Sequence, residues 1–337
     1  MSPRGRTRLA LAAGLYAGVF LVTSAVGSLG YFHFGKPEHT CASCHEMTVA
    51  HSAWSSSAHS TLHCRECHGG TLTLDAHALR AHVNRLVRHF TREPAAEIRL
   101  REDDILRLQA ACQRCHPQAA ADWKASGHAS TYEHFFLDPT HNRAERLGPD
   151  CLRCHGMFFD GNIEDLVSPV STSGPWALKD PSRSPKPAIP CLACHEVHVP
   201  AAGGTGPQLY VRREKASFAV GILPPLLTQL GTSPVRVSSD PRQRLCVQCH
   251  APNASRQAGT ADDRTPLGVH EGLSCLDCHS GHSNSARASC ASCHPGSSHC
   301  GIDVEKMDTT FLSTASRHNI HFVACEDCHG GVRPARK

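Results

Sequence analysis

Nine copies of one five-residue motif, Cys-Xaa-Xaa-Cys-His, constrain the fold of this 337-residue chain more than any other sequence feature. We number them 1 to 9 in chain order. They use eighteen of the nineteen cysteines, and each places an imidazole directly after its second thiol. The cysteine pairs are Cys41 and Cys44, Cys64 and Cys67, Cys112 and Cys115, Cys151 and Cys154, Cys191 and Cys194, Cys246 and Cys249, Cys275 and Cys278, Cys290 and Cys293, and Cys325 and Cys328. The histidines are His45, His68, His116, His155, His195, His250, His279, His294 and His329.

Zinc knuckles and disulfides also use two cysteines at this spacing, but neither requires a histidine directly after the second one. Histidine fills 26 of the 337 positions, so nine histidines after nine cysteine pairs do not arise by chance. Two thiols that form thioethers to a haem, and an imidazole that binds its iron, account for the whole motif. The sequence therefore predicts nine covalently bound c-type haems with iron, each with its motif histidine as proximal ligand.

The chain is short for so many haems. Dividing 337 residues by nine gives about 37 residues per haem, and only 5% of the residues are aromatic. Such a chain cannot enclose each haem in its own apolar core, so we expect the haems to pack against one another, with no ordinary globular domain. With 22 Pro and 26 Gly along the chain, the prediction is an elongated, mostly α fold with extensive irregular loops and little or no sheet.

The formal charge of +4 does not indicate a nucleic-acid partner. The lysines and arginines are scattered along the chain, and the propionates of the predicted haems would more than cancel this charge. Arginine suits these carboxylates because it binds them in bidentate geometry.

Residues 9–32 contain no charged side chain over 24 positions, and Arg4, Arg6 and Arg8 precede them. This length spans a bilayer, and the basic residues place the N-terminus in the cytoplasm. A cleaved signal peptide is the alternative, but the uninterrupted length favours a retained anchor. We therefore predict a single-pass protein of the cytoplasmic (inner) membrane with its haem domain in the periplasm.

Several segments between the motifs are informative. Residues 72–90 have the spacing of an amphipathic helix, and residues 95–113 form a second helical run into motif 3. The sequence from Trp123 to His128 repeats that from Trp54 to His59, which indicates duplication of a helix-then-haem unit.

Residues 156–190 and 199–245 are rich in Pro, Ser and Gly, and we interpret them as loops or lids over haem edges. Cys300, the nineteenth cysteine, is a buried thiol, an intermolecular disulfide partner or an unusual ligand.

Seventeen non-proximal histidines and Met47 give eighteen side chains for nine sixth iron positions. Six-coordinate haems cannot bind substrate at iron, so a full ligand set favours electron transfer. His198 and His282 follow a proximal histidine by three residues, too close to bind the same iron from its other face, so we assign them to neighbouring haems. Met47 is a candidate thioether ligand or an apolar contact. The distal candidates are Met47, His59, His128, His198, His270, His282, His299, His318 and His321.

Residues 1–130 resemble the NapC/NirT family of membrane-anchored, quinol-oxidising cytochromes. The resemblance is carried by the apolar segment, CASCHEM at 41–47, His59 before CRECH at 64–68, and LRLQAACQRCH at 106–116. It implies quinol oxidation near the first haem, with Lys36, Glu38, Glu46 and Asp75 as candidate proton acceptors. Electrons would pass between the membrane quinone pool and a periplasmic redox protein or terminal reductase.

From about residue 150 the chain looks instead like other periplasmic multihaem cytochromes, with segments such as VHEGLSCLDCHSGH. We therefore expect an anchor at 1–36, a NapC/NirT-like module with motifs 1 to 3 at 37–135, and a C-terminal module with motifs 4 to 9 at 136–337.

Two other functions stay open. One is a reductase of a small nitrogen or sulfur oxyanion, which needs an open haem. The other is a wire subunit of a larger respiratory or extracellular electron-transfer complex.

Overall fold

The computed structural model describes residues 3–35, 42, 47–69, 87, 102–149, 151–195, 197, 208–211, 216–219, 229–230, 233–243, 246, 249–250, 264–283, 286–294 and 321. The chain divides into two compact units. The first is Met1–Leu100 with Val197–Gly204, and the second is Arg101–Glu196 with Thr205–Lys337. The predicted division at residues 36 and 135 stays a prediction. Most of the predicted helix at 72–90, and Cys300, lie outside the described residues.

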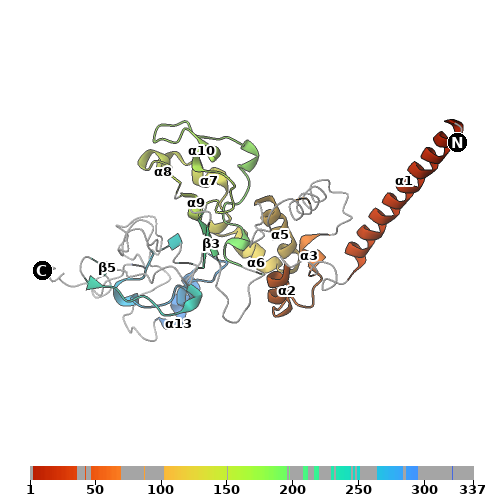
Figure 1. The fold of residues 1–337 in the computed structure, drawn as a ribbon. Helices are drawn as coiled ribbons and strands as arrows, with labels where there is room; N and C mark the ends of the chain where they lie inside the picture. The colour runs from red at the N-terminus through yellow and green to blue at the C-terminus, as the bar shows by residue number, and fades with distance from the viewer. Residues whose placement is uncertain are drawn as a thin grey trace, which may run out of the picture. The chain divides into compact units, whose positions relative to one another are not determined.

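Helices carry most of the regular structure (Figure 1). The helices of the first unit are α1 (Pro3–Phe34), α2 (Thr48–Ser55) and α3 (Cys64–His68). Those of the second unit are α5 (Glu102–Cys115), α6 (Pro117–Lys124), α7 (Tyr132–Phe136), α8 (Pro139–Ala144), α9 (Cys151–Cys154), α10 (Ile163–Leu166), α12 (Cys275–Cys278) and α13 (Arg287–Cys293). Short 3-10 turns are η3 (Gly127–Ala129), η4 (Pro181–Arg183), η5 (Cys191–Ala193), η8 (Pro241–Gln243) and η9 (Gly268–His270).

Strands are few and short among the described residues. Three antiparallel pairs, each of two strands, form no larger sheet there. They are β1 (Val167–Ser168) with β2 (Ala177–Leu178), β3 (Gln208–Val211) with β4 (Ala216–Ala219), and β5 (Gln229–Leu230) with β6 (Ser233–Pro234). The prediction of a mostly α fold with little or no sheet is confirmed.

Helix α1 is one uninterrupted helix of 32 residues (Figure 1). Its segment Arg8–Ser28 has a mean hydropathy of 2.0 and is not buried by the rest of the chain. About 20 apolar residues in a helix suffice to cross the hydrocarbon core of a bilayer. The predicted N-terminal apolar helix is therefore confirmed, and both a membrane anchor and a signal peptide fit its length and composition.

Residues 131–188 form a conventional apolar core, contrary to the sequence-based expectation. Tyr132 and Phe136 of α7 pack there with residues of α10, β1 and β2, and helices α7 to α10 lie together (Figure 1). The core consists of Tyr132, Phe136, Leu147, Ile163, Leu166, Val167, Leu178 and Ala188. Residues 156–190 are largely irregular, as predicted, and they also supply five of the eight core residues, which the sequence did not predict. Their role as lids over haem edges stays a prediction.

A buried carboxylate fastens α5 to this core. Glu102, only 7% exposed, accepts hydrogen bonds from the hydroxyl of Tyr132 and from the guanidinium of Arg183. Burial and then the Glu102 charge raise the pKa of Tyr132, which therefore stays protonated as a donor. One residue along, Asp103 pairs with Lys186 at 3.0 Å. The start of α5 is thereby fixed, and α5 ends in the cysteines of motif 3.

We expect Glu102→Ala to lower the free energy of unfolding by about 1–3 kcal/mol, because the buried Tyr132 hydroxyl loses its acceptor and the half-buried Arg183 guanidinium keeps only Asp180 as a carboxylate partner among the described residues. Glu145→Ala is the matched control. Its carboxylate is 69% exposed beside His141, and such surface pairs contribute about 0–1 kcal/mol. Urea unfolding measures both. Equal, small losses would show that the Glu102 cluster does not hold α5 in place.

Candidate haem-binding sites

The described motifs share one backbone turn. In motifs 3, 4, 5, 7 and 8 the histidine N–H donates to the carbonyl of the first cysteine, at 2.7 to 3.0 Å. With 3.6 residues per helical turn, cysteines three positions apart lie on one face and the histidine follows beside them. Both thiols and the imidazole therefore project to one side of the turn, as attachment to one haem requires.

The sequence around motif 7 shows how such a turn begins. The Ser274 hydroxyl accepts from the Leu276 N–H at 3.2 Å, and the Asp277 carboxylate accepts from the Ser274 N–H at 2.8 Å. This reciprocal arrangement is a capping box, which satisfies backbone donors at a helix start. The aspartate between the two cysteines of CLDC therefore has a local structural role.

The exposure of the cysteines fits covalent haem attachment. Fourteen cysteines, the pairs of motifs 2 to 8, belong to the described residues, and each is half-buried or exposed. Unmodified structural cysteines are among the most deeply buried residue types. Within the described residues no group of three or more His, Cys, Asp or Glu has the geometry to hold a metal ion.

A buried glutamine joins motif 3 to motif 5. Gln109, 6% exposed, lies three residues before Cys112, and its Oε1 accepts from the Cys191 N–H at 3.0 Å. Burial and then Cys112 raise the pKa of the Cys191 thiol, which places the two first cysteines close together. The two attachment sites are therefore neighbours although their sequences are far apart.

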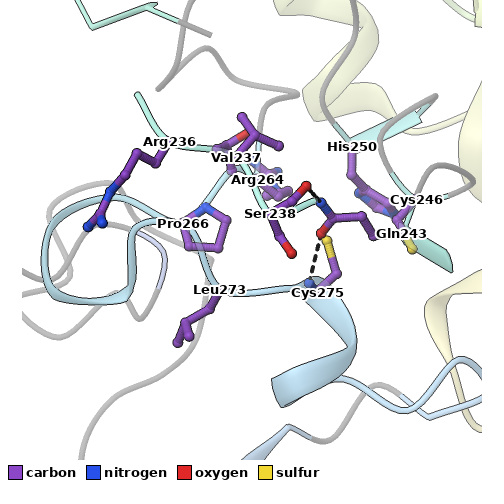
Figure 2. A pocket seen from close by; sticks show the side chains of 11 residues that line it. Arg236, Val237, Ser238, Gln243, Cys246, His250, Arg264, Pro266, Leu273 and Cys275 are labelled. Atoms are coloured by element: carbon purple, nitrogen blue, oxygen red, sulfur yellow. Dashed lines mark hydrogen bonds between the residues drawn. The ribbon is translucent and has the colours of Figure 1, made fainter. Parts of the chain in front are cut away.

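The same arrangement joins motif 6 to motif 7. Gln243, 4% exposed, lies three residues before Cys246, and its Oε1 accepts from the Cys275 N–H at 3.1 Å. Its amide nitrogen donates to the Ser238 carbonyl at 2.7 Å, so both ends of the side chain are held (Figure 2). Contact with Cys275 lowers the pKa of the Cys246 thiol to about 7.

These residues line a small pocket (Figure 2). Cys246 and His250 of motif 6 and Cys275 of motif 7 open onto it, together with Leu273, Arg236 and Arg264. Cys246 and His250 suit the haem of motif 6, whereas Cys275 suits the haem of motif 7. Arg236 pairs with Glu271 at 3.4 Å.

Two further contacts extend the series of attachment sites. Cys194 of motif 5 lies near Cys246 of motif 6, and burial and then this neighbour raise the pKa of Cys194. The Ser289 hydroxyl, one residue before motif 8, donates to the Cys278 carbonyl of motif 7 at 2.8 Å. Motifs 3, 5, 6, 7 and 8 thus form a continuous row of neighbours in the second unit, while Cys151 of motif 4 packs against the apolar core.

Four pairs of histidine rings lie face to face or edge to face across this row. Their ring centroids are 5.7 to 6.4 Å apart, and Nε2 of His195 lies 3.4 Å from Nε2 of His282. Each pair combines a motif histidine with a histidine from outside the motifs. The pairs are His195 with His282, His250 with His128, His279 with His321, and His294 with His270.

Burial keeps several of these imidazoles neutral, which is the form that binds a metal. Desolvation is the main cause of the lowered pKa values of His128, His195 and His279. Desolvation and then His279 lower the pKa of His321 to about 4. The donor atoms therefore fit haem iron in protonation state as well as in position.

The repeated sequences fold alike. The Ser57 hydroxyl donates to the Trp54 carbonyl at 2.8 Å and accepts from the His59 N–H at 3.1 Å. In the second copy, the Ser126 hydroxyl donates to the Trp123 carbonyl at 2.8 Å and accepts from the His128 N–H at 3.3 Å. A serine two residues before a histidine therefore fixes the turn that presents it.

The structure describes some of the predicted site residues and not others. His68, His116 and His155 lie in the shared turn or directly after it, as do His195, His279 and His294. Met47 precedes α2 and is half-buried, and its ligation stays a prediction, as does that of His59. Outside the described residues lie Cys41, Cys44, His45, Cys325, Cys328, His329, His198, His299, His318, Lys36, Glu38, Glu46 and Asp75.

Two histidines of the first unit were not among the sequence candidates. Nε2 of His51 and Nδ1 of His63 are buried and have no hydrogen-bond partner among the described residues. A buried polar atom without a partner costs about 1–3 kcal/mol, so these nitrogens fit a role toward iron. The sequence could have indicated His63, because Thr61 stands two residues before it, as Ser57 and Ser126 stand before His59 and His128. No comparable sequence pattern precedes His51.

Two protein-family models match parts of the chain. The cytochrome c554 and c-prime model matches residues 111–166, with motifs 3 and 4, and the cytochrome c3 model matches residues 231–295, with motifs 6 to 8. Searches for similar characterised proteins and for similar solved structures gave no match. Together with the motifs, these matches make the chain a multihaem c-type cytochrome, an electron-transfer protein with haem iron as its cofactor. Neither match covers residues 1–110, so the NapC/NirT resemblance stays a prediction.

We expect Gln243→Ala to lower the free energy of unfolding of the haem-loaded protein by about 1–3 kcal/mol, because it leaves the buried Cys275 N–H without an acceptor. Gln118→Ala on α6 is the matched control, since Gln118 contacts Asp122 on an exposed helix face. Urea unfolding measures both variants, and Gln243→Glu, which keeps an acceptor oxygen, should recover part of the loss. Equal losses for Gln243→Ala and Gln118→Ala would contradict this role.

Proposed function

We propose that the chain is a membrane-anchored nonahaem c-type cytochrome of the inner membrane that passes electrons between the quinone pool and a periplasmic acceptor. The haem supplies reversible one-electron chemistry at iron. The residues of the chain attach the haems, hold their irons between imidazoles and keep neighbouring haems adjacent. The acceptor is a periplasmic redox protein or a terminal reductase.

The continuous row of attachment sites carries this proposal. Gln109 joins motif 3 to motif 5, Gln243 joins motif 6 to motif 7, and Ser289 joins motif 7 to motif 8. The contact of His195 with His282 joins motif 5 to the segment that follows motif 7. Transfer between haems requires that they be close, whereas catalysis at iron requires an open coordination position. A row of adjoining sites with paired imidazoles therefore supports a relay better than a reductase.

The N-terminal segment supports the quinone pool as one end of the relay. Helix α1 ends at Phe34, and motif 1 begins at Cys41. At most about 3.6 Å per residue, this linker keeps the first haem within about 25 Å of the helix end. Lys36, Glu38, Glu46 and Asp75 remain the candidate proton acceptors of a quinol site.

The purified protein should contain nine haems per chain. A pyridine haemochrome assay against protein concentration measures this number. Cys191→Ser with Cys194→Ser should remove one haem, because these thiols form the thioethers of motif 5. Cys300→Ser is the matched control and should keep all nine, since Cys300 belongs to no motif. Loss of a haem with Cys300→Ser, or none with the double variant, would contradict the assignment.

A menaquinol analogue should reduce the haems of the full-length protein in detergent. Lys36→Ala or Asp75→Asn should slow reduction about tenfold or more, as expected when a positioned proton acceptor is lost. Lys124→Ala, an exposed lysine at the end of α6, is the control and should reduce at the unaltered rate. Stopped-flow absorbance measures the rates. Haems that dithionite reduces but the quinol does not would contradict the proposed donor and favour a wire subunit.

A further inference from the structure

We infer that the four histidine pairs are the axial ligand pairs of four haems. His282 is the sixth ligand at motif 5, His128 at motif 6, His321 at motif 7 and His270 at motif 8. The inference depends on the haems of the proposed relay but not on its electron donor.

The ring separations are those of two imidazoles on opposite sides of one metal ion. Metal–imidazole bonds are about 2 Å long, so trans nitrogens lie about 4 Å apart and their ring centroids about 6 Å apart. The four observed centroid distances are 5.7, 6.0, 6.1 and 6.4 Å. For His195 and His282 the facing atoms are the two Nε2, at 3.4 Å, so both rings point their donor nitrogens at the same place.

The composition of the pairs supports the same conclusion. In each of the four histidine–histidine ring contacts seen among the described residues, one member belongs to a motif and the other does not. One proximal and one distal ligand per iron produces the pattern observed.

The partner imidazoles are held in place by backbone contacts. The Ser126 hydroxyl accepts from the His128 N–H at 3.3 Å, and the Ser280 hydroxyl accepts from the His282 N–H at 3.5 Å. The His321 carbonyl accepts from the Leu267 N–H at 2.7 Å. The His270 carbonyl accepts from the Leu273 N–H at 3.1 Å. Each of the four histidines therefore has a backbone contact that holds its segment.

The pairing interlocks neighbouring haems. His282, the ligand at motif 5, follows the motif 7 histidine by three residues, and it is 87 residues from His195. His270, the ligand at motif 8, lies five residues before motif 7. Each iron thus ties together two segments that are distant in sequence, and all four irons are closed to external ligands.

Quantitative electron paramagnetic resonance of the oxidised full-length protein tests the assignment. His282→Ala should convert one low-spin haem to high-spin, and His282→Met should keep that haem low-spin and raise its potential. His141→Ala, which alters a non-motif histidine paired only with Asn142 and Glu145 among the described residues, should change neither signal. An unchanged low-spin count in His282→Ala would overturn the ligand assignment.

A haem-deletion background identifies which iron is affected. In Cys191→Ser with Cys194→Ser, which lacks the motif 5 haem, adding His282→Ala should create no high-spin signal. Adding His128→Ala in that background should still create one, from motif 6. A high-spin signal from His282→Ala in the deletion background would overturn the assignment of His282 to motif 5. These spectra need no quinol. The ligand assignment can therefore fail while the quinol still reduces the haems, and the assignment can hold while the quinol does not reduce them.

Discussion

In our account the second unit depends on one interaction, in which two imidazoles from distant segments meet at one iron. The chain has few aromatic residues and little apolar surface to bury around motifs 5 to 8. Coordination at each iron, together with two thioethers, supplies the cross-links that an apolar core supplies elsewhere. In our account His195 and His282 join segments 87 residues apart, so haem attachment and folding of this unit are coupled.

The second unit combines this arrangement with an ordinary core. Residues 131–188 bury Tyr132, Phe136 and Ile163 almost completely. Glu102 and Asp103 fasten α5 to that core through Arg183 and Lys186, and α5 carries Gln109 and motif 3. The apolar core therefore serves as a fixed base, from which the row of attachment sites begins with motif 3.

The sequence predicted the local features of the site and not its pairings. The shared turn of the motifs follows from residue spacing, so the attachment residues could be recognised directly. Which distal histidine binds at which motif depends on tertiary folding. Because the chain has more non-motif histidines than sixth iron positions, the sequence alone could not assign the proximal–distal pairs. The core at 156–190 escaped prediction because Pro, Gly and Ser dominate its composition, while its few apolar residues follow no helical or strand period. Gln109 and Gln243 each lie three residues before a motif. The sequence shows this spacing, but only the structure shows that each glutamine accepts a hydrogen bond from the first cysteine of another motif.

A relay needs neighbouring haems at fixed separation, and the described contacts provide this in the order 3, 5, 6, 7, 8. The most direct measurement is iron anomalous scattering from crystals of the haem-loaded chain. Our account predicts that four of the iron peaks each lie between the two imidazoles of one pair: His195 with His282, His250 with His128, His279 with His321, and His294 with His270. An iron of motifs 5 to 8 bound by any other pair of side chains would contradict it.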